Sequence, residues 1–349
     1  MTTPLPSPPN AVQAAIRRIA FGDSLDAELA TEAFGSVMRG EATAAQIAAL
    51  LVGLRVKGET AAEVTGAARA LRGAMLRLPV AENDLLVDTC GTGGGAVPTF
   101  NISTAAALLA AGAGVRIAKH GNRSFTTQSG SADVLEQLGV TLEAPVELAA
   151  RALDEAGITF MFAPTMHPAM RHVGPVRREL GIPTVMNIVG PLANPAGAAR
   201  QVVGVAERGR MALLSGALAS LGAAHALVVH GEPGMDEISP MGLTHVAEVR
   251  DGSVREWTID PADYGFGRFA ASDLKGGSPA ENARTIVDVL AGRGGPAATA
   301  AVVLNAAGAL YVAPGSRSFA DCVTAAADAL ANGSGTAALE RMRKAYSHR

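Results

Sequence analysis

Apolar residues follow a helical period in the first part of the chain. Residues 11–78 show spaced apolar positions and no strand-like run, so this segment is predicted to be helical throughout. Two capping-box patterns, Thr43 with Gln46 and Thr60 with Glu63, mark helix starts within it. The segment is therefore expected to form a small helical domain.

From residue 85, short buried-strand patterns alternate with helical ones. Strands are predicted at 85–89, 115–118, 158–162, 201–205, 226–230 and 244–249. Helices are predicted at 104–113, 131–138, 208–221, 280–290, 297–310 and 320–330. Alternation of this kind predicts an α/β fold, in which a mostly parallel central sheet is flanked by helices.

Composition and charge narrow the class of protein. Lys and Arg together number 29 against 32 Asp and Glu, so the net charge of −3 gives no basic surface for nucleic acid. The two cysteines cannot build a disulfide framework, and no secretory hydrophobic segment opens the chain. The longest apolar runs are too short to span a bilayer. We therefore expect a soluble cytoplasmic protein without nucleic-acid or membrane partners.

A glycine-rich turn is the strongest local signal for chemistry. Asp-Thr-Cys-Gly-Thr-Gly-Gly-Gly at 88–95 begins at the end of the first predicted strand and leads through Thr-Phe-Asn-Ile-Ser-Thr at 99–104 to a helix start. Clustered glycines let backbone N–H groups approach an anion, and a helix N-terminus adds positive partial charge. The pattern is neither a dinucleotide fingerprint nor a P-loop. It predicts a phosphate site, although Ser103 and Thr104 can also be explained as helix N-caps.

Two more clusters follow predicted strands, where ligands of open α/β sheets bind. Lys-His-Gly-Asn-Arg at 119–123 offers cations for an anionic substrate, and the alternative for Lys119 and Arg123 is a solvated turn. Asp236 and Glu237 are either surface charge or ligands of a hard cation held together with a substrate phosphate. A phosphate-binding loop elsewhere in the chain favours the metal interpretation.

Arginines and histidines gather at residues 167–181. This stretch is either a solvated helical face or a place where one guanidinium binds a substrate carboxylate through a bidentate fork. The pattern by itself leaves both interpretations open.

Seven motifs together resemble the anthranilate phosphoribosyltransferases. The chain contains, in the order of that family, Gly-Thr-Gly-Gly, Asn-Ile-Ser-Thr, Lys-His-Gly-Asn-Arg, His-Pro-Ala-Met, Val-Arg-x-x-Leu-Gly, Gly-Pro-Leu-x-Asn-Pro and Met-Asp-Glu-Ile-Ser. The resemblance implies transfer of the phosphoribosyl group from 5-phosphoribosyl 1-pyrophosphate to anthranilate. The products would be N-(5-phosphoribosyl)anthranilate and pyrophosphate, in the second step of tryptophan biosynthesis from chorismate.

The resemblance also implies a domain organisation, a cofactor and an assembly. Residues 11–80 are expected to form the small helical domain, with helices from about 166–190 packed on it. Residues 81–349 are expected to form the large domain that binds phosphoribosyl pyrophosphate, while the Pro-rich residues 1–10 are expected to be disordered. One or two Mg²⁺ ions and a homodimer are implied.

The resemblance assigns three groups of site residues. Phosphoribosyl pyrophosphate is expected to contact Gly91, Thr92, Gly93, Gly94, Gly95, Thr99, Asn101, Ile102, Ser103, Thr104, Lys119, His120, Gly121, Asn122, Arg123, Ser124, Phe125, Thr126, Thr127 and Ser131. Anthranilate is expected to contact Gly91, Asn122, Arg177, His120 and His167. Magnesium is expected to bind Ser103, Asp236 and Glu237, and Lys119 is expected to stabilise the leaving group.

Gly95 departs from the pattern of the family, which usually has Asp after Gly-Thr-Gly-Gly. The missing carboxylate leaves open how many magnesium ions bind and how tightly. A positive φ at Gly95, which an Asp would strain, is the alternative reason for glycine at this position.

Two other functions are alternatives to this assignment. Ser-Gly-Ser-Ala-Asp-Val-Leu-Glu at 129–136 has some similarity to pyrimidine nucleoside phosphorylases, but the Asp-Glu pair and His-Pro-Ala-Met do not belong to that family. The other rival is an inactive relative that binds nucleic acid. The metal ligands and the negative net charge count against it.

Overall fold

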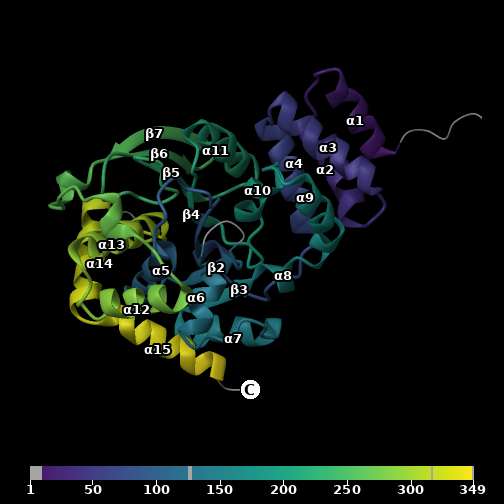
Figure 1. The fold of residues 1–349 in the computed structure, drawn as a ribbon. Coiled ribbons are helices and arrows are strands. Elements are labelled where there is room, and N and C mark those ends of the chain that lie inside the picture. The colour runs from purple at the N-terminus through teal and green to yellow at the C-terminus, as the bar shows by residue number, and fades with distance from the viewer. Residues whose placement is uncertain (1–9, 125–127, 316, 348–349) are drawn as a thin grey trace, which may run out of the picture. The chain divides into compact units, whose positions relative to one another are not determined.

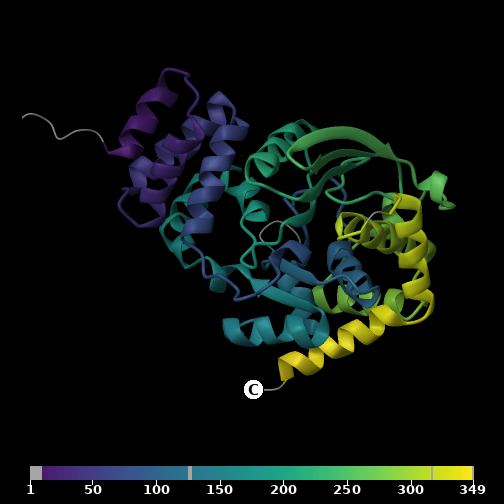
Figure 2. The same ribbon diagram turned by 180° about the vertical axis from the view of Figure 1, so that it is seen from behind.

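The computed structural model of the protein describes residues 10–124, 128–315 and 317–347. The chain divides into two units (Figures 1 and 2). The small unit is made of Met1–Met75 and His167–Ala193, and the large unit of Leu76–Met166 and Asn194–Arg349. Apart from Asn10, which caps the first helix, the predicted disordered N-terminus lies outside the described residues.

Helices make up the described part of the small unit. They are α1 (Ala11–Ala20), α2 (Ala27–Met38), α3 (Ala44–Lys57), α4 (Ala61–Gly73), η2 (Pro168–His172), α9 (Gly174–Leu180), α10 (Met186–Val189) and η3 (Gly190–Leu192). Both predicted capping boxes are present, at Thr43 and at Thr60. The carboxylate of Glu63 is fully buried, accepts the Leu25 N–H at 2.9 Å and pairs with Lys57 at 3.0 Å. It thereby ties α4 to α3 and to the start of α2.

A seven-stranded sheet in the order β3-β2-β1-β4-β5-β6-β7 forms the centre of the large unit. Its strands are β1 (Val87–Gly91), β2 (Ile117–Gly121), β3 (Ile158–Phe162), β4 (Arg200–Gly204), β5 (His225–Gly231), β6 (Thr244–Arg250) and β7 (Ser253–Ile259). The first five strands pair in parallel, and β6 and β7 are added antiparallel. The predicted fold class is confirmed.

Helices flank this sheet. The long helices of the unit are α5 (Ile102–Gly112), α6 (Ser131–Gln137), α7 (Val146–Ala156), α11 (Met211–Ser220), α12 (Pro279–Leu290), α13 (Pro296–Val312), α14 (Phe319–Ala331) and α15 (Ser334–Ser347). The short ones are η1 (Asn83–Leu85), α8 (Ala163–Met166), η4 (Arg208–Arg210), η5 (Pro261–Tyr264) and η6 (Ala271–Leu274). α5 packs on β1, β2 and β3, α13 on β1, β4 and β5, and α11 on β5, β6 and β7.

Alternating side chains of the strands enter different cores. Ile117 of β2 belongs to the main core with α5 and α13, whereas its neighbour Ala118 belongs to a second cluster with Leu153 of α7. This alternation is expected for a sheet covered on both faces. Among the described residues, no helix has the length and apolar character needed to cross a lipid bilayer.

Some predicted boundaries are wrong at the strand ends. β1 and β2 continue to Gly91 and Gly121, so Lys119 and His120 lie within a strand and not in a loop after it. Parallel pairing with β3 extends the strand, because Lys119 is paired with Phe160. The side chain of Lys119 therefore has a position fixed by the sheet.

The predicted capping roles at the start of α5 are also wrong. Asn101 is the N-cap residue, so Ser103 and Thr104 lie in the first helical turn. The helices α7 and α15 and the strand β7 were not predicted. Most of β7 is exposed, and its polar residues hide the strand pattern.

Candidate active site

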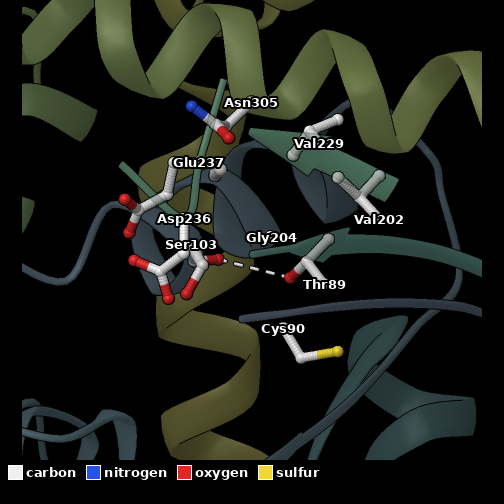
Figure 3. A pocket seen from close by; sticks show the side chains of 10 residues that line it. Thr89, Cys90, Ser103, Val202, Gly204, Val229, Asp236, Glu237 and Asn305 are labelled. Carbon is white, nitrogen blue, oxygen red and sulfur yellow. Dashed lines mark hydrogen bonds between the residues drawn. The ribbon is translucent and has the colours of Figure 1, made fainter. Parts of the chain in front are cut away.

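The carboxyl ends of four parallel strands meet at one edge of the sheet, where β1, β2, β4 and β5 end at Gly91, Gly121, Gly204 and Gly231. Beside these ends is a small cavity (Figure 3). It is lined by Thr89, Cys90, Ser103, Ala106, Val202, Gly204, Val229, Asp236, Glu237 and Asn305. The predicted metal ligands, which come from two distant motifs, thus surround one cavity.

The loop after β5 is held against the glycine-rich turn. The Gly93 N–H donates to Asp236 Oδ2 at 2.8 Å. A Cβ at Gly204 would lie 1.6 Å from the backbone oxygen of Asp236, so only glycine allows this approach. On the other side, the Asn305 amide of α13 bonds both the N–H (2.9 Å) and the oxygen (2.8 Å) of Ile238. The backbone around the carboxylates is therefore fixed from both sides.

Asp236 and Glu237 have the electrostatics of a cation site. Desolvation raises the pKa of Asp236. Desolvation and then the charge of Asp236 raise the pKa of Glu237 well above its usual value, and Lys119 offsets part of this rise. A bound cation would relieve the cost of keeping both carboxylates ionised.

The donor set fits magnesium. Asp236, Glu237 and Ser103 offer hard oxygen atoms, and their side chains gather on one side of the cavity in Figure 3, away from the sulfur of Cys90. Within the described residues, no three His, Cys, Asp or Glu side chains are arranged to hold a metal. Water and substrate oxygens would therefore complete the coordination, as is usual for magnesium.

Lys119 is buried, with 3 % of its surface exposed, which excludes the solvated-turn alternative for this residue. Its ammonium donates to the backbone oxygen of Thr89 and, at 3.3 Å, to Ser103 Oγ. Desolvation lowers its pKa, and the nearby carboxyl of Asp88 opposes that shift. An ammonium held inside the protein is well placed to stabilise negative charge.

The side chains of Asp88 and Asn194 form hydrogen bonds with the backbone of β2, the strand that carries Lys119. The sequence analysis assigned no role to either residue. Asp88 Oδ1 accepts the His120 N–H at 3.2 Å, and Oδ2 accepts from Asn194 Nδ2 at 2.8 Å. Asn194 Nδ2 also donates to the Ala118 oxygen at 2.9 Å. These residues are far apart in the sequence, so no local motif indicated the contact.

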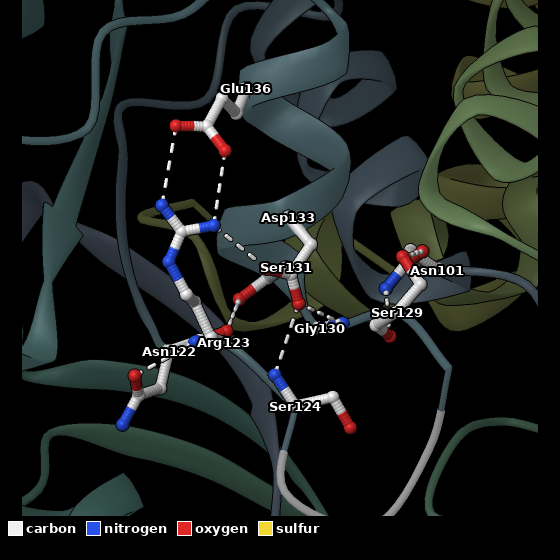
Figure 4. Close-up of polar contacts among 9 residues, drawn as sticks. All are labelled: Asn101, Asn122, Arg123, Ser124, Ser129, Gly130, Ser131, Asp133 and Glu136. Atoms are coloured by element: carbon white, nitrogen blue, oxygen red, sulfur yellow. Dashed lines mark hydrogen bonds and ion pairs between the residues drawn. The ribbon is translucent and has the colours of Figure 1, made fainter.

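The predicted substrate residue Asn101 is the centre of a polar network (Figure 4). It donates to the Ser129 oxygen at 3.1 Å and accepts from Ser129 Oγ at 3.0 Å. Asn282 of α12, which was not predicted, donates to Asn101 Oδ1 at 2.9 Å. The network connects the start of α5 to the segment that precedes α6.

The other residues predicted to contact phosphate differ in how exposed they are. Ile102 and Thr104 are buried, and within the described residues the Thr104 hydroxyl has no hydrogen-bond partner. Arg123 is exposed, as the solvated-turn alternative predicts, and its guanidinium pairs with Asp133 and Glu136. The predictions for Phe125, Thr126 and Thr127 lie outside the described residues.

The glycine-rich turn needs glycine at two positions for conformational reasons. Gly93 and Gly94 have φ of 69° and 80°, whereas Gly95 has no positive φ. The conformational explanation for Gly95 is therefore wrong. A Cβ at Gly95 would lie 3.1 Å from Asp236 Oδ1, so an Asp at this position would face the predicted metal ligand. Thr99 beyond the turn pairs with Lys275 as an isolated bridge.

Residues predicted to contact anthranilate belong to both units. Gly91, His120 and Asn122 are in the large unit, and His167 and Arg177 are in the small unit. Desolvation lowers the pKa of His167 to about 4, with a backbone hydrogen bond to Ala193 opposing the shift, so the ring is neutral at pH 7. Desolvation also lowers the pKa of the half-buried Arg177 guanidinium.

Comparison with known proteins places the chain among characterised sequences and structures. Two models of the glycosyl transferase family match it, the helical bundle domain at residues 13–75 and the a/b domain at residues 83–336. The chain is 51% identical to the anthranilate phosphoribosyltransferase of Rubrobacter xylanophilus, over 94% of this chain and 95% of that protein. It is 49% identical to the one of Anaeromyxobacter sp. (strain K), over 95% and 97%.

Solved structures give the same result. The crystal structure of anthranilate phosphoribosyltransferase from Thermus thermophilus matches with a TM-score of 0.90 and 42% identity, covering 95% of this chain and 99% of that one. The enzyme from Saccharomyces cerevisiae in complex with PRPP and Mg matches with a TM-score of 0.87 and 25% identity, covering 97% and 98%.

Proposed function

The chain belongs to the anthranilate phosphoribosyltransferases of the glycosyl transferase family, and from this we propose how its residues perform that reaction. The reaction transfers the phosphoribosyl group of 5-phosphoribosyl 1-pyrophosphate to anthranilate in tryptophan biosynthesis. The observation that supports our assignment is that Ser103, Asp236 and Glu237 line one cavity, while Lys119 donates to Ser103 and the glycine-rich turn donates to Asp236.

The chemistry requires stabilisation of a leaving group. The bond between the anomeric carbon of the ribose and the pyrophosphate oxygen breaks, and the anthranilate nitrogen forms the new bond and then loses a proton to solvent water. Lys119 and the N–H groups of the glycine-rich turn are proposed to stabilise the departing pyrophosphate. Ser103, Asp236 and Glu237 would hold magnesium, which supplies further positive charge when bound. An aromatic amine is neutral at pH 7, so no general base is required.

The nucleophile needs orientation more than activation. We propose that Arg177 binds the carboxylate of anthranilate and that Asn122 contacts the same substrate, with His120 and His167 as further contacts. His167, being neutral, would contribute shape and hydrogen bonding without charge. Asn122, Ser124 and Ser131 are proposed to contact phosphoribosyl pyrophosphate together with residues 91–95, Thr99 and residues 101–104.

One assay tests the function. The protein is mixed with phosphoribosyl pyrophosphate, magnesium chloride and anthranilate, and anthranilate fluorescence is followed over time. We expect the fluorescence to change only when all three are present, with equal amounts of pyrophosphate released. Unchanged fluorescence, together with phosphorolysis of a pyrimidine nucleoside or binding of nucleic acid, would refute the assignment.

Gly95→Asp is expected to make the protein more dependent on magnesium. Its carboxylate would face Asp236, and like charges at this distance repel, at a cost of about 1 kcal/mol for a partly exposed pair. We expect the melting temperature without magnesium to fall by roughly 2–4 °C, and magnesium to restore it more than in the wild type. Gly95→Ala is the matched control, because it adds the Cβ without the charge. Identical magnesium responses of the two variants would disprove the charge argument.

We also propose a homodimer in the cytoplasm, as the family resemblance implies. The two most exposed large hydrophobic residues among those described, Phe21 (87%) and Val56 (81%), both belong to the small unit. Light scattering coupled to size-exclusion chromatography, repeated with Phe21→Ser and Val56→Ser, measures whether a dimer forms and whether this surface contributes to it.

A further inference from the structure

One carboxylate joins both ends of the segment between β2 and α6 (Figure 4). Asp133, in the first turn of α6, accepts the Ser124 N–H at 3.1 Å and the Gly130 N–H at 2.9 Å with the same oxygen, Oδ2. Its Oδ1 accepts from Arg123 Nη1 at 2.9 Å. Asp133 therefore connects the part of the segment that leaves β2 with the part that enters α6.

The two parts are in direct backbone contact where Asp133 joins them. A Cβ at Gly130 would lie 2.4 Å from the Ser124 nitrogen and 2.6 Å from the Asn122 oxygen. The Ala132 N–H donates to that same Asn122 oxygen at 3.2 Å, and Ser131 Oγ approaches it at 3.4 Å. The positions of Asn122 and Ser131 are thus set by the same contact between residues 122–124 and residues 130–132 that Asp133 completes. We call this contact the closure.

Arg123 does not depend on Asp133 alone. Glu136, one helical turn further along α6, binds the same guanidinium through both of its oxygens, at 3.0 and 3.2 Å. The Arg123 and Glu136 side chains are 43% and 51% exposed, and exposed ion pairs contribute little to stability. The side chain of Asp133 is only 18% exposed, and it accepts two backbone N–H groups that Glu136 does not reach.

Asp133 is charged at neutral pH. Desolvation by itself would raise the pKa of its carboxyl, but the hydrogen bonds from Gly130, Ser124 and Arg123 together lower it. Hydrogen bonds to an ionised acceptor are about twice as strong as neutral ones. The closure is therefore held by strong contacts.

We propose that Asp133 is a positioning residue for phosphoribosyl pyrophosphate, acting by fixing the backbone of residues 122–124 against Gly130. It rests on the proposed function, in which Asn122, Ser124 and Ser131 contact this substrate, whereas Asp133 itself does not. Loss of Asp133 should therefore weaken binding of phosphoribosyl pyrophosphate most, with a smaller effect on anthranilate, which is proposed to contact only Asn122 of these residues.

Calorimetric titration of phosphoribosyl pyrophosphate in magnesium chloride tests the proposal on the wild type and three variants. Asp133→Ala removes the acceptor of two backbone N–H groups, and we expect its Kd to rise about tenfold. Asp133→Asn keeps an oxygen for these groups, so we expect a rise of about threefold. Glu136→Gln is the matched control, since it weakens only the exposed pair with Arg123, and we expect less than a twofold change.

Steady-state kinetics separate positioning from general damage. In Asp133→Ala we expect KM for phosphoribosyl pyrophosphate to rise with Kd, while kcat stays within about twofold and KM for anthranilate rises less than KM for phosphoribosyl pyrophosphate. A folded Asp133→Ala with wild-type Kd would overturn the proposal. If that variant does not fold, equal effects of Asp133→Asn and Glu136→Gln would overturn it.

Amide exchange keeps this proposal separate from the proposed function. The Ser124 and Gly130 amides should exchange about tenfold faster in Asp133→Ala than in the wild type, whether or not any substrate binds. If the wild type fails to bind phosphoribosyl pyrophosphate, the proposed function fails and exchange still tests the closure. Unchanged exchange at both amides would overturn the role of Asp133.

Discussion

Asp236→Asn combined with Glu237→Gln is expected to lower magnesium-dependent turnover by about a thousandfold or more. Both side chains line one cavity with Ser103, and amides are far weaker magnesium ligands than carboxylates. Removing a single donor that stabilises charge in a transition state already costs about 10²–10³ in kcat. The substituted Asn keeps an oxygen for the Gly93 N–H, so the loop backbone should stay in place.

The same variant should remain folded. Burial raises the pKa of both carboxyls, which means that their ionised forms cost folding free energy at neutral pH. Neutral amides avoid that cost. We therefore expect the melting temperature in magnesium-free buffer to stay the same or rise, and the stabilisation by added magnesium to disappear.

Glu232→Gln provides the matched control. Glu232 is an exposed carboxylate four residues before Asp236, and it contacts His245 at 3.4 Å. Turnover of this variant should stay within about twofold of the wild type, because exposed ion pairs contribute little. Near-normal activity of the double variant, or failure to fold, would show that the two carboxylates do not form the metal site.

Much of the fold could be predicted because the strands of a covered parallel sheet are continuous apolar runs. β3 (Ile158–Phe162) is buried at every position, and such a run is recognisable without any knowledge of its neighbours. β7 carries Arg255 and Glu256 and is largely exposed at the edge of the sheet. Its stability comes from antiparallel pairing with β6, which a local pattern does not reveal.

The residues of the candidate site also fall into those that a local sequence pattern indicates and those that only the fold brings together. Glycine clusters and adjacent carboxylates are local patterns, so Gly93 and Asp236 could be identified from the sequence. Asn194 and Asn282 act on Asp88 and Asn101 across 106 and 181 residues, and only the folded chain brings them together. Asp133 was not singled out for a different reason. An acid in the first turn of a helix is common, and helix capping is a sufficient explanation for it.

Arg177→Ala is expected to raise KM for anthranilate about ten- to a hundredfold, the effect of losing one charge-assisted contact to a carboxylate. Arg177 is half-buried in α9, and desolvation lowers the pKa of its guanidinium. Its side chain donates to Asn187 Oδ1 at 3.4 Å, and no carboxylate among the described residues forms a salt bridge with it. A partly desolvated guanidinium without an acidic partner is suited to an anionic ligand.

The neighbouring Arg178 supplies the control, because a helix turns about 100° per residue and Arg178 is exposed. Arg178→Ala should change KM for anthranilate less than twofold, and Arg177→Lys should be intermediate because it keeps the charge but loses the fork. A second control changes the substrate: with aniline, which lacks the carboxylate, wild type and Arg177→Ala should perform equally. KM for phosphoribosyl pyrophosphate should be unaffected in all variants. Equal effects of the two alanine variants, or an equal loss with aniline, would remove Arg177 from the carboxylate site.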